Sequence, residues 1–301
     1  MDKKNSRNMV GYGKKMPKIK WPNNSKLALQ IVLNYEEGSE NCVLNGDKYS
    51  ENFLSEIINA QPIKGRHVNM ESIYEYGSRR GFWRLHELFQ EKKIPITIFG
   101  VGMALEKNHD VCDAIKESNY EIASHGWRWI DYQNIPKKIE KKHMQLAIQS
   151  IKKMFGERPL GWYTGRCSPN TRDLVMEEGG FLYDSDSYSD DIPYWEIRGK
   201  KKQLIIPYTL DNNDMRFATN QGFNSGDQFY TYLKDSFDAL YNEGNKSPKM
   251  MSVGLHCRLI GRPGRIQSLK KFLDYALKHN DVWICRRLDI AKHWIKEYSD
   301  L

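Results

Sequence analysis

The chain has 301 residues, of which 40% are apolar and 28% are charged, and this balance indicates a folded globular protein rather than a disordered one. Its formal charge of +8 is distributed over separate short lysine clusters, so we expect a solvated surface and no nucleic-acid-binding face. No apolar run approaches the roughly 18 residues that a membrane span needs, which argues against a membrane protein.

The cysteines and the N-terminal residues bear on the compartment. Five cysteines are present, an odd number, and no two of them lie within four residues of each other. This argues against a disulfide framework and against a CxxC zinc site. The N-terminal residues are basic and polar through Lys20 and lack the apolar stretch of a secretory signal. We therefore predict a cytoplasmic protein, which does not meet cell-wall polymer.

The chain begins with a segment that is unsuited to regular structure. Residues 1–24 contain glycines, prolines and the Asn23-Asn24 pair, all of which interrupt helices and strands. Trp21 indicates that this N-terminal arm packs on the remaining domain or on a partner subunit. Because no linker or shift in composition follows, we predict that residues 25–301 form a single domain.

From residue 27 onward, short apolar stretches alternate with stretches of helical periodicity. Strands are predicted at 27–33, 94–99, 120–124, 160–164, 181–184, 204–207, 250–256 and 281–285. Helices are predicted at 79–92, 108–118, 137–155, 226–242, 266–278 and 287–297, with one more after Ser168-Pro169-Asn170. This alternation indicates parallel strands joined by helical crossovers. We predict an α/β fold, a distorted (β/α) barrel of seven or eight parallel strands, with long functional excursions at 34–78 and 208–224.

Polar residues stand where the predicted strands end. They are Glu36 and Glu37 after the first strand, His125 and Trp129 after the third, Arg166 after the fourth, Asp184 after the fifth, and His256 and Arg258 after the seventh. Each alone has a plainer interpretation, because paired acids are often surface residues and a lone histidine or arginine is often structural. Parallel strands end on one face of a barrel, and burying several titratable groups without a task is costly. Their joint placement therefore favours a single active site.

This order of residues resembles the polysaccharide deacetylase family, which has the fold of chitin and peptidoglycan deacetylases. That family has an Asp-Asp pair after the first strand, His-x-x-x-His after the third, then an arginine, an aspartate and a histidine after the fourth, fifth and seventh. In the family the first Asp is the base, and the second Asp and the two histidines hold a divalent metal. The resemblance implies a barrel of the polysaccharide-deacetylase type with a catalytic domain that hydrolyses amides.

Two departures from the family pattern concern the metal. Glu36-Glu37 replaces Asp-Asp, and Trp129 replaces the second histidine. The indole nitrogen of tryptophan has no lone pair to give a metal, whereas a hydrolytic zinc site normally takes three protein ligands. His125 and one carboxylate supply two. We therefore predict no bound metal and no other cofactor.

The chain also resembles a narrower group, the metal-independent allantoinases, which open the hydantoin ring of allantoin. The shared motifs lie at 34–38, 67–72, 74–77, 124–126, 161–166, 183–188, 207–209, 212–217, 222–226 and 254–258. The resemblance implies a homotetramer that acts on a small molecule in purine catabolism.

Roles follow from the resemblance to the family positions. Glu36 is expected to be the general base, held ionised by Arg166. His256 is expected to be the general acid toward the leaving ring nitrogen, with Asp184 tuning its charge. The expected substrate-binding residues are Glu37, His125, Trp129, Asn213, Asp214 and Arg258. Among these, Trp129 is expected to form a flat wall for the planar ring.

Rival interpretations stay open. One is a metal-dependent deacetylase of N-acetylated carbohydrate, or a hydrolase of another cyclic ureide or imide. The missing histidine and the missing export signal count against the deacetylase. The other is a binding protein without catalysis, and the presence together of a base, an acid and their expected partners counts against it.

Overall fold

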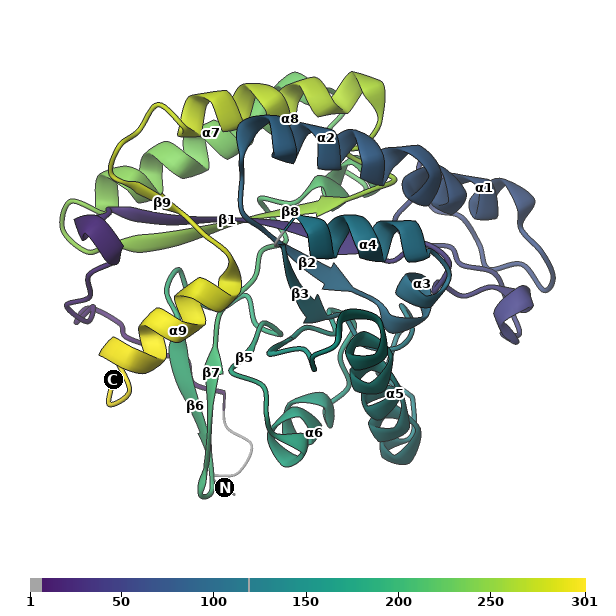
Figure 1. Ribbon diagram of the computed structural model, residues 1–301, viewed down its shortest axis with the longest axis horizontal. Helices are drawn as coiled ribbons and strands as arrows, with labels where there is room; N and C mark the ends of the chain where they lie inside the picture. Colours follow the sequence, from purple (N-terminus) through teal and green to yellow (C-terminus); the bar gives the residue numbers. More distant parts are fainter. Residues whose placement is uncertain (1–6, 119) are drawn as a thin grey trace.

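A single curved sheet forms the centre of the protein, whose computed structural model describes residues 7–118 and 120–301 (Figure 1). Within those residues the strands run in the order β6, β7, β5, β4, β3, β2, β1 and β8, and β9 also pairs with β1. Their bounds are β1 (Leu27–Tyr35), β2 (Ile96–Gly100), β3 (Glu121–Ser124), β4 (Gly161–Trp162), β5 (Tyr183–Asp184), β6 (Tyr194–Arg198), β7 (Lys201–Ile205), β8 (Lys249–His256) and β9 (Val282–Ile284).

Helices cover the outside of this sheet. They are α1 (Val68–Tyr76), α2 (Phe82–Lys92), α3 (Gly102–Glu106), α4 (His109–Glu117), α5 (Lys137–Phe155), α6 (Thr171–Glu178), α7 (Gly226–Glu243), α8 (Pro263–Ala276) and α9 (Arg287–Glu297). A π-helical turn (Gly77–Gly81) joins α1 to α2, and short 3₁₀ turns occur at Pro22–Asn24, Val43–Asn45 and Asp214–Ala218. In Figure 1, α7, α8 and α2 lie along one side of the sheet, and α5 and α6 lie on the other.

The predicted α/β fold with parallel strands is confirmed. β1 pairs in parallel with β2, β8 and β9, and the parallel order continues through β3, β4, β5 and β7. The sheet curls toward closure, because Asn213 in the segment after β7 forms a parallel bridge with Gly254 in β8. The carboxyl ends of the strands therefore meet around one cleft-forming face, as expected for a barrel.

Three elements are absent from the sequence prediction, namely β6, α1 and the short helix α3. β6 is an additional strand that pairs antiparallel with β7, and its largely exposed residues carry no buried apolar run that could reveal it. Helix α1 lies inside the predicted excursion at 34–78, where Met70 and Tyr74 are its buried residues. Two apolar residues one turn apart are too few for the periodicity that identifies a helix.

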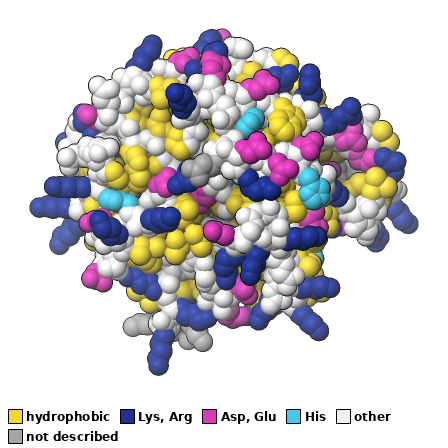
Figure 2. All heavy atoms as spheres, in the orientation of Figure 1, with side chains coloured by type: hydrophobic (Ala, Val, Ile, Leu, Met, Phe, Trp, Pro, Cys, Tyr) yellow, Lys and Arg dark blue, Asp and Glu magenta, His cyan; other side chains and the backbone are white. Residues whose placement is uncertain are grey.

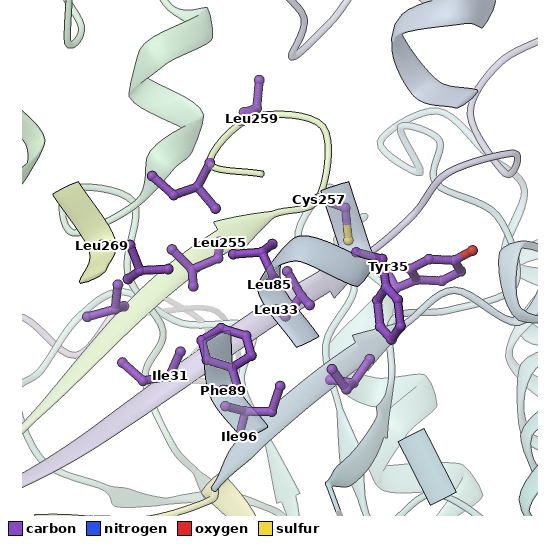
Figure 3. Close-up of a cluster of buried hydrophobic side chains, with 14 of the residues drawn as sticks. Ile31, Leu33, Tyr35, Leu85, Phe89, Ile96, Leu255, Cys257, Leu259 and Leu269 are labelled. Carbon is purple, nitrogen blue, oxygen red and sulfur yellow. The ribbon is translucent and has the colours of Figure 1, made fainter. Parts of the chain in front are cut away.

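β1 separates two clusters of buried side chains. Its odd-numbered residues, including Ile31, Leu33 and Tyr35, pack against α2 and α8 in the cluster drawn in Figure 3. Its even-numbered residues face the inside of the barrel, because successive side chains of a strand point to opposite faces. The same alternation, continued one residue beyond the strand, also points the side chain of Glu36 inward, and Glu36 is buried.

Residues 7–24 of the N-terminal arm include two buried side chains, Ile19 and Trp21, and residues 1–6 of the arm lie outside the described residues. The ring of Trp21 is buried against Trp283, His293 and Trp294, and its Nε1 donates a hydrogen bond to Lys249 O at 2.8 Å. The arm is thereby attached beside β8, β9 and α9.

The surface is mixed in charge. On the face shown in Figure 2, lysine and arginine side chains project around the whole outline and alternate with acidic ones rather than gathering in a single patch. Across the described residues, no helix combines the length and the apolar composition needed to cross a bilayer.

Candidate active site

Glu36 lies at the centre of the buried polar side chains that follow the strand ends. Only 1% of it is exposed. Its Oε1 lies 3.3 Å from His125 Nε2 and 3.4 Å from His256 Nε2, and its Oε2 lies 2.8 Å from Arg258 Nη1. Three segments that are distant in the sequence, following β1, β3 and β8, thus meet at one carboxylate.

The surroundings of Glu36 keep it ionised. Burial would raise the pKa of Glu36, but the charges of His256 and Arg258 and hydrogen bonds from the two histidines hold that pKa well below its usual value. For His256, burial would lower the pKa, yet the charges of Glu36 and Asp214 raise the pKa to about 9. Near neutral pH the pair is therefore a carboxylate beside an imidazolium, which is a base next to an acid.

Asp214 is the carboxylate that orients His256. Its Oδ1 lies 2.6 Å from His256 Nδ1, and its Oδ2 accepts hydrogen bonds from the backbone N–H groups of His256 at 2.8 Å and Ile260 at 3.0 Å. Asn213 caps the 3₁₀ turn that Asp214 begins, because its Oδ1 accepts from Met215 N at 2.9 Å. The side-chain oxygens of Asn213 and Asp214, which we expected to bind a substrate, therefore already have hydrogen-bond partners within the protein.

The predicted contact between Asp184 and His256 is not what the structure shows. Asp184 Oδ2 lies 3.1 Å from Arg172 Nη1, and its Oδ1 accepts from Asp186 N at 2.8 Å. The reason is positional, since β5 pairs with β4 and β7 and not with β8, whereas the segment of Asp214 lies directly beside β8.

Arg258, and not Arg166, holds the general-base candidate. Its Nη1 lies 2.8 Å from Glu36 and 3.4 Å from Glu37 Oε1, and its Nε donates to Leu54 O at 2.9 Å. Its guanidinium carbon lies 4.2 Å from the centroid of the Tyr74 ring. These contacts fix the orientation of the guanidinium at the acidic pair.

Arg166 lies on the outer side of this arrangement. It lies 3.5 Å from Glu51 Oε2, and its guanidinium carbon lies 5.5 Å from the ring centroid of Phe53 and 4.9 Å from that of Trp129. The predicted pairing of Arg166 with Glu36 is therefore absent, because Glu51 supplies the carboxylate that Arg166 meets first.

Glu37 is held by a close approach of backbone. Its Oε2 accepts a hydrogen bond from the backbone N–H of Glu36 at 3.1 Å. A Cβ atom at Gly77, the first residue of the π-helical turn, would lie 2.3 Å from Glu37 Oε1. Burial raises the pKa of Glu37, partly offset by Arg258. The glycine at this position therefore makes room for a second buried carboxylate.

A covering segment, residues 51–55, closes the site from outside. The Phe53 ring stacks on Trp129 with centroids 6.1 Å apart and planes inclined by 9°. Phe53 O accepts from Tyr74 OH at 3.1 Å, and Glu51 Oε1 accepts from the backbone N–H groups of Asn52 and Phe53 at 3.0 and 3.1 Å. Sequence reasoning missed these residues, although the length of the excursion at 34–78 indicated a functional loop.

Leu54 is unusual within the covering segment because its φ is +48°, in the left-handed region that a branched residue rarely adopts. Outside the segment, a groove of about 540 Å³ is lined by Phe53, Gly165, Arg166 and neighbouring residues. Phe53 and Arg166 thus line the groove, whereas His125, His256 and Arg258, which contact Glu36, do not.

Buried polar atoms around Glu36 lack hydrogen-bond partners. They are His125 Nδ1, Arg258 Nη2 and Glu36 Oε2, although the last keeps its ion-pair contact with Arg258. Buried polar groups are nearly always satisfied in folded proteins. Unsatisfied atoms of three adjacent side chains indicate a place where a polar ligand binds.

The side chains present do not suit the divalent metal of the deacetylase pattern. Trp129 occupies the position of a ligand, and across residues 7–118 and 120–301 no group of three or more His, Cys, Asp and Glu side chains is arranged to hold a metal ion. The Arg258 guanidinium already places a positive charge beside both Glu36 and Glu37. A divalent cation at these carboxylates would be repelled by the fixed positive charge of the Arg258 guanidinium.

Comparison with known proteins places this site in a family. Residues 69–177 match the polysaccharide deacetylase family. A "Putative polysaccharide deacetylase" of Schizosaccharomyces pombe is 43% identical, over 96% of this chain and 97% of that protein. Two solved structures, a "probable Polysaccharide deacetylase" of Pseudomonas aeruginosa and PuuE allantoinase, are each 56% identical, with a TM-score of 0.96 over 98% of this chain and 99% of theirs. The family predicted from the sequence is thereby confirmed, and the chain belongs to the polysaccharide deacetylase family.

Proposed function

We propose that the chain is a hydrolase that opens the hydantoin ring of allantoin to give allantoate, without a metal. The observation that carries the proposal is the buried Glu36–His256 pair, in a chain 56% identical to PuuE allantoinase. An ionised carboxylate beside an imidazolium has the two functions that amide hydrolysis needs, which are activation of water and protonation of the leaving nitrogen.

The reaction consumes one water molecule. Glu36 takes a proton from the water as its oxygen attacks the ring carbonyl carbon, and the carbonyl oxygen becomes an oxyanion. The ring C–N bond then breaks as His256 gives its proton to the departing nitrogen. The proton on Glu36 passes to His256, whose Nε2 lies 3.4 Å from Glu36 Oε1, and the new carboxylic acid releases one proton to solvent.

Other side chains have supporting roles in this proposal. Asp214 stabilises the imidazolium of His256, the role that the sequence assigned to Asp184. His125, whose Nδ1 has no partner in the site, and Glu37 bind N–H groups or the attacking water. Trp129 offers a flat surface to the planar ring. In the structure the Phe53 ring stacks on Trp129 in the same way.

The first experiment uses metal-stripped full-length protein. It is incubated with allantoin, and allantoate is measured by chromatography, with an N-acetylated oligosaccharide and acetate release as the comparison. We expect allantoate and no acetate. Acetate release that depends on added zinc, without formation of allantoate, would instead identify a carbohydrate deacetylase.

The Glu36→Gln variant tests the base. The amide cannot accept the proton of water, so we expect kcat to fall by about 10²- to 10⁴-fold. Circular dichroism establishes that the variant is folded. A folded variant that keeps wild-type kcat would remove Glu36 from the mechanism.

The resemblance also supports a homotetramer that functions in cytoplasmic purine catabolism, and we propose these features together. Sedimentation equilibrium of the purified protein measures the assembly. A monomer at all concentrations would contradict the proposed tetramer and leave the proposed reaction unaffected.

A further inference from the structure

Two adjacent carboxylates share one fixed cation in the active site. Glu36 and Glu37 are both buried, and the Arg258 guanidinium, which is fully buried itself, lies 2.8 Å from one and 3.4 Å from the other. Burying two acids is costly unless a cation compensates their charge. In the deacetylase pattern that compensation comes from a divalent metal, and here it comes from the side chains of Arg258 and His256.

The guanidinium has one nitrogen to spare. Its Nε donates to Leu54 O, and its Nη1 faces both carboxylates, but its Nη2 has no hydrogen-bond partner although it is buried. The Tyr74 ring and the Trp129 ring lie 4.2 and 5.1 Å from the guanidinium carbon. The spare N–H groups are thus held in a fixed direction beside the general base and the aromatic wall.

We propose that Arg258 is a catalytic residue. It polarises the substrate carbonyl and stabilises the oxyanion, which is the role of the metal in the deacetylases. Its Nη2 donates to the ring carbonyl oxygen of the substrate, while its Nη1 keeps Glu36 ionised. As water adds to the carbonyl carbon, the electron pair of the C=O bond moves to the oxygen, and the guanidinium stabilises the resulting oxyanion. When the C–N bond breaks, this pair reforms the carbonyl. The inference rests on the proposed hydrolysis of a cyclic ureide.

A fixed guanidinium suits this part better than an ammonium. Its planar fork reaches the carboxylates through one nitrogen and the substrate through another, whereas lysine has one nitrogen on a flexible stem. A donor that is already oriented costs no reorganisation when charge develops on the oxygen. We therefore expect lysine at this position to restore the charge balance but not the rate.

The main test compares Arg258→Ala with Arg158→Ala, in full-length protein. Arg158 is half-buried and donates to Gly179 O, outside the active site. Loss of one oxyanion donor lowers kcat by about 10²- to 10³-fold, so we expect at least this loss in the Arg258 variant and an unchanged rate in the control. Guanidinium chloride below denaturing concentrations should restore part of the lost rate only in the Arg258 variant. A folded Arg258→Ala enzyme within threefold of wild type would overturn the proposal.

Two further measurements keep the result interpretable. If Arg258→Ala does not fold, Arg258→Lys takes its place, and kcat should still fall by about 10-fold or more with little change in KM.

Cobalt(II) titration, followed by visible absorption, measures metal binding without substrate turnover. We expect tighter binding to Arg258→Ala than to the wild type, because removing the fixed positive charge leaves Glu36 and Glu37 less compensated, although Trp129 still supplies no ligand. Equal cobalt binding by both proteins would contradict the substitution of metal by arginine. Failure of the wild type to hydrolyse allantoin would contradict the proposed function and leave the cobalt comparison intact.

Discussion

At the scale of single residues, the site consists of charged groups that each depend on a partner. Glu36 is a useful base only while it is ionised, and His256 a useful acid only while it is protonated. Their mutual attraction supports both states, with Asp214 behind the histidine and Arg258 beside the carboxylate. Removal of any one partner therefore changes the titration of the others.

The pH dependence of the rate follows from His256. Its pKa is raised to about 9, so the protonated acid is present below that pH and is lost as the pH rises through it. We expect kcat/KM to be level near neutral pH and to fall with an apparent pKa near 9, measured over a series of buffers. In Asp214→Asn the fall should move to lower pH, because a neutral amide no longer supports the imidazolium.

Asp184→Asn is the matched control for that shift. Asp184 is buried but pairs with Arg172 at 3.1 Å rather than with His256. We expect its alkaline limb to remain where the wild-type limb lies. Movement of the limb in the Asp184 variant and not in the Asp214 variant would restore the assignment made from sequence.

At the scale of elements, most strands and helices were predictable from periodicity, and the contacts between their ends were not. Apolar runs placed β1, β2, β3 and β8 within about three residues of their observed bounds. The same reasoning identified Glu36, His125 and His256, because a strand end is visible in sequence. It chose Arg166 as the partner of Glu36, where the structure has Arg258, because the partner depends on side-chain directions across the barrel that the sequence does not show.

Gly77, in the π-helical turn before α2, is expected to be sensitive to substitution. In Gly77→Ala the new Cβ would lie 2.3 Å from Glu37 Oε1, and the buried carboxylate or the turn must shift. We expect a loss of about 1–3 kcal/mol in the free energy of unfolding, measured with denaturant. Gly264→Ala in α8 is the control, because a Cβ there meets no atom within 4 Å, and its stability should be unchanged or higher. Equal effects of the two substitutions would show that the close approach to Glu37 is unimportant.

The covering segment predicts local rather than global loosening. In Glu51→Gln the side chain keeps its shape but loses the charge that faces Arg166 and accepts from Asn52 and Phe53. We expect faster hydrogen exchange at residues 51–55, observed by mass spectrometry, with the β1 peptide unchanged. Glu56→Gln, which affects an exposed pair with Arg265, should leave exchange in the segment at its wild-type rate. Identical exchange in both variants would contradict the role of Glu51.

At the scale of the whole molecule, the N-terminal arm and the C-terminal helix secure the same side of the barrel. Trp21 packs on Trp283 and Trp294, which come from β9 and α9, and donates to β8. Residues near the two ends of the chain thus meet beside the strand that ends at His256. Sequence reasoning predicted that Trp21 packs, but it could not identify the surface, because a single aromatic residue specifies no partner.

This packing predicts a large stability effect. Trp21→Ala should lower the free energy of unfolding by about 3–5 kcal/mol, because it removes a fully buried aromatic side chain and one hydrogen bond. Chemical denaturation measures the change, and Val10→Ala, at an exposed position of the same arm, should have little effect. Similar stability of Trp21→Ala and wild type would mean that the arm contributes nothing to the fold.

The hydrogen bond from Arg258 Nε to Leu54 O connects the covering segment directly to the arginine that contacts Glu36. If the covering segment moves, Arg258 loses the hydrogen bond to Leu54 O, which is one of the contacts that orient its guanidinium beside Glu36. We therefore expect the orientation of Arg258 at Glu36 to be firmest when residues 51–55 are in place.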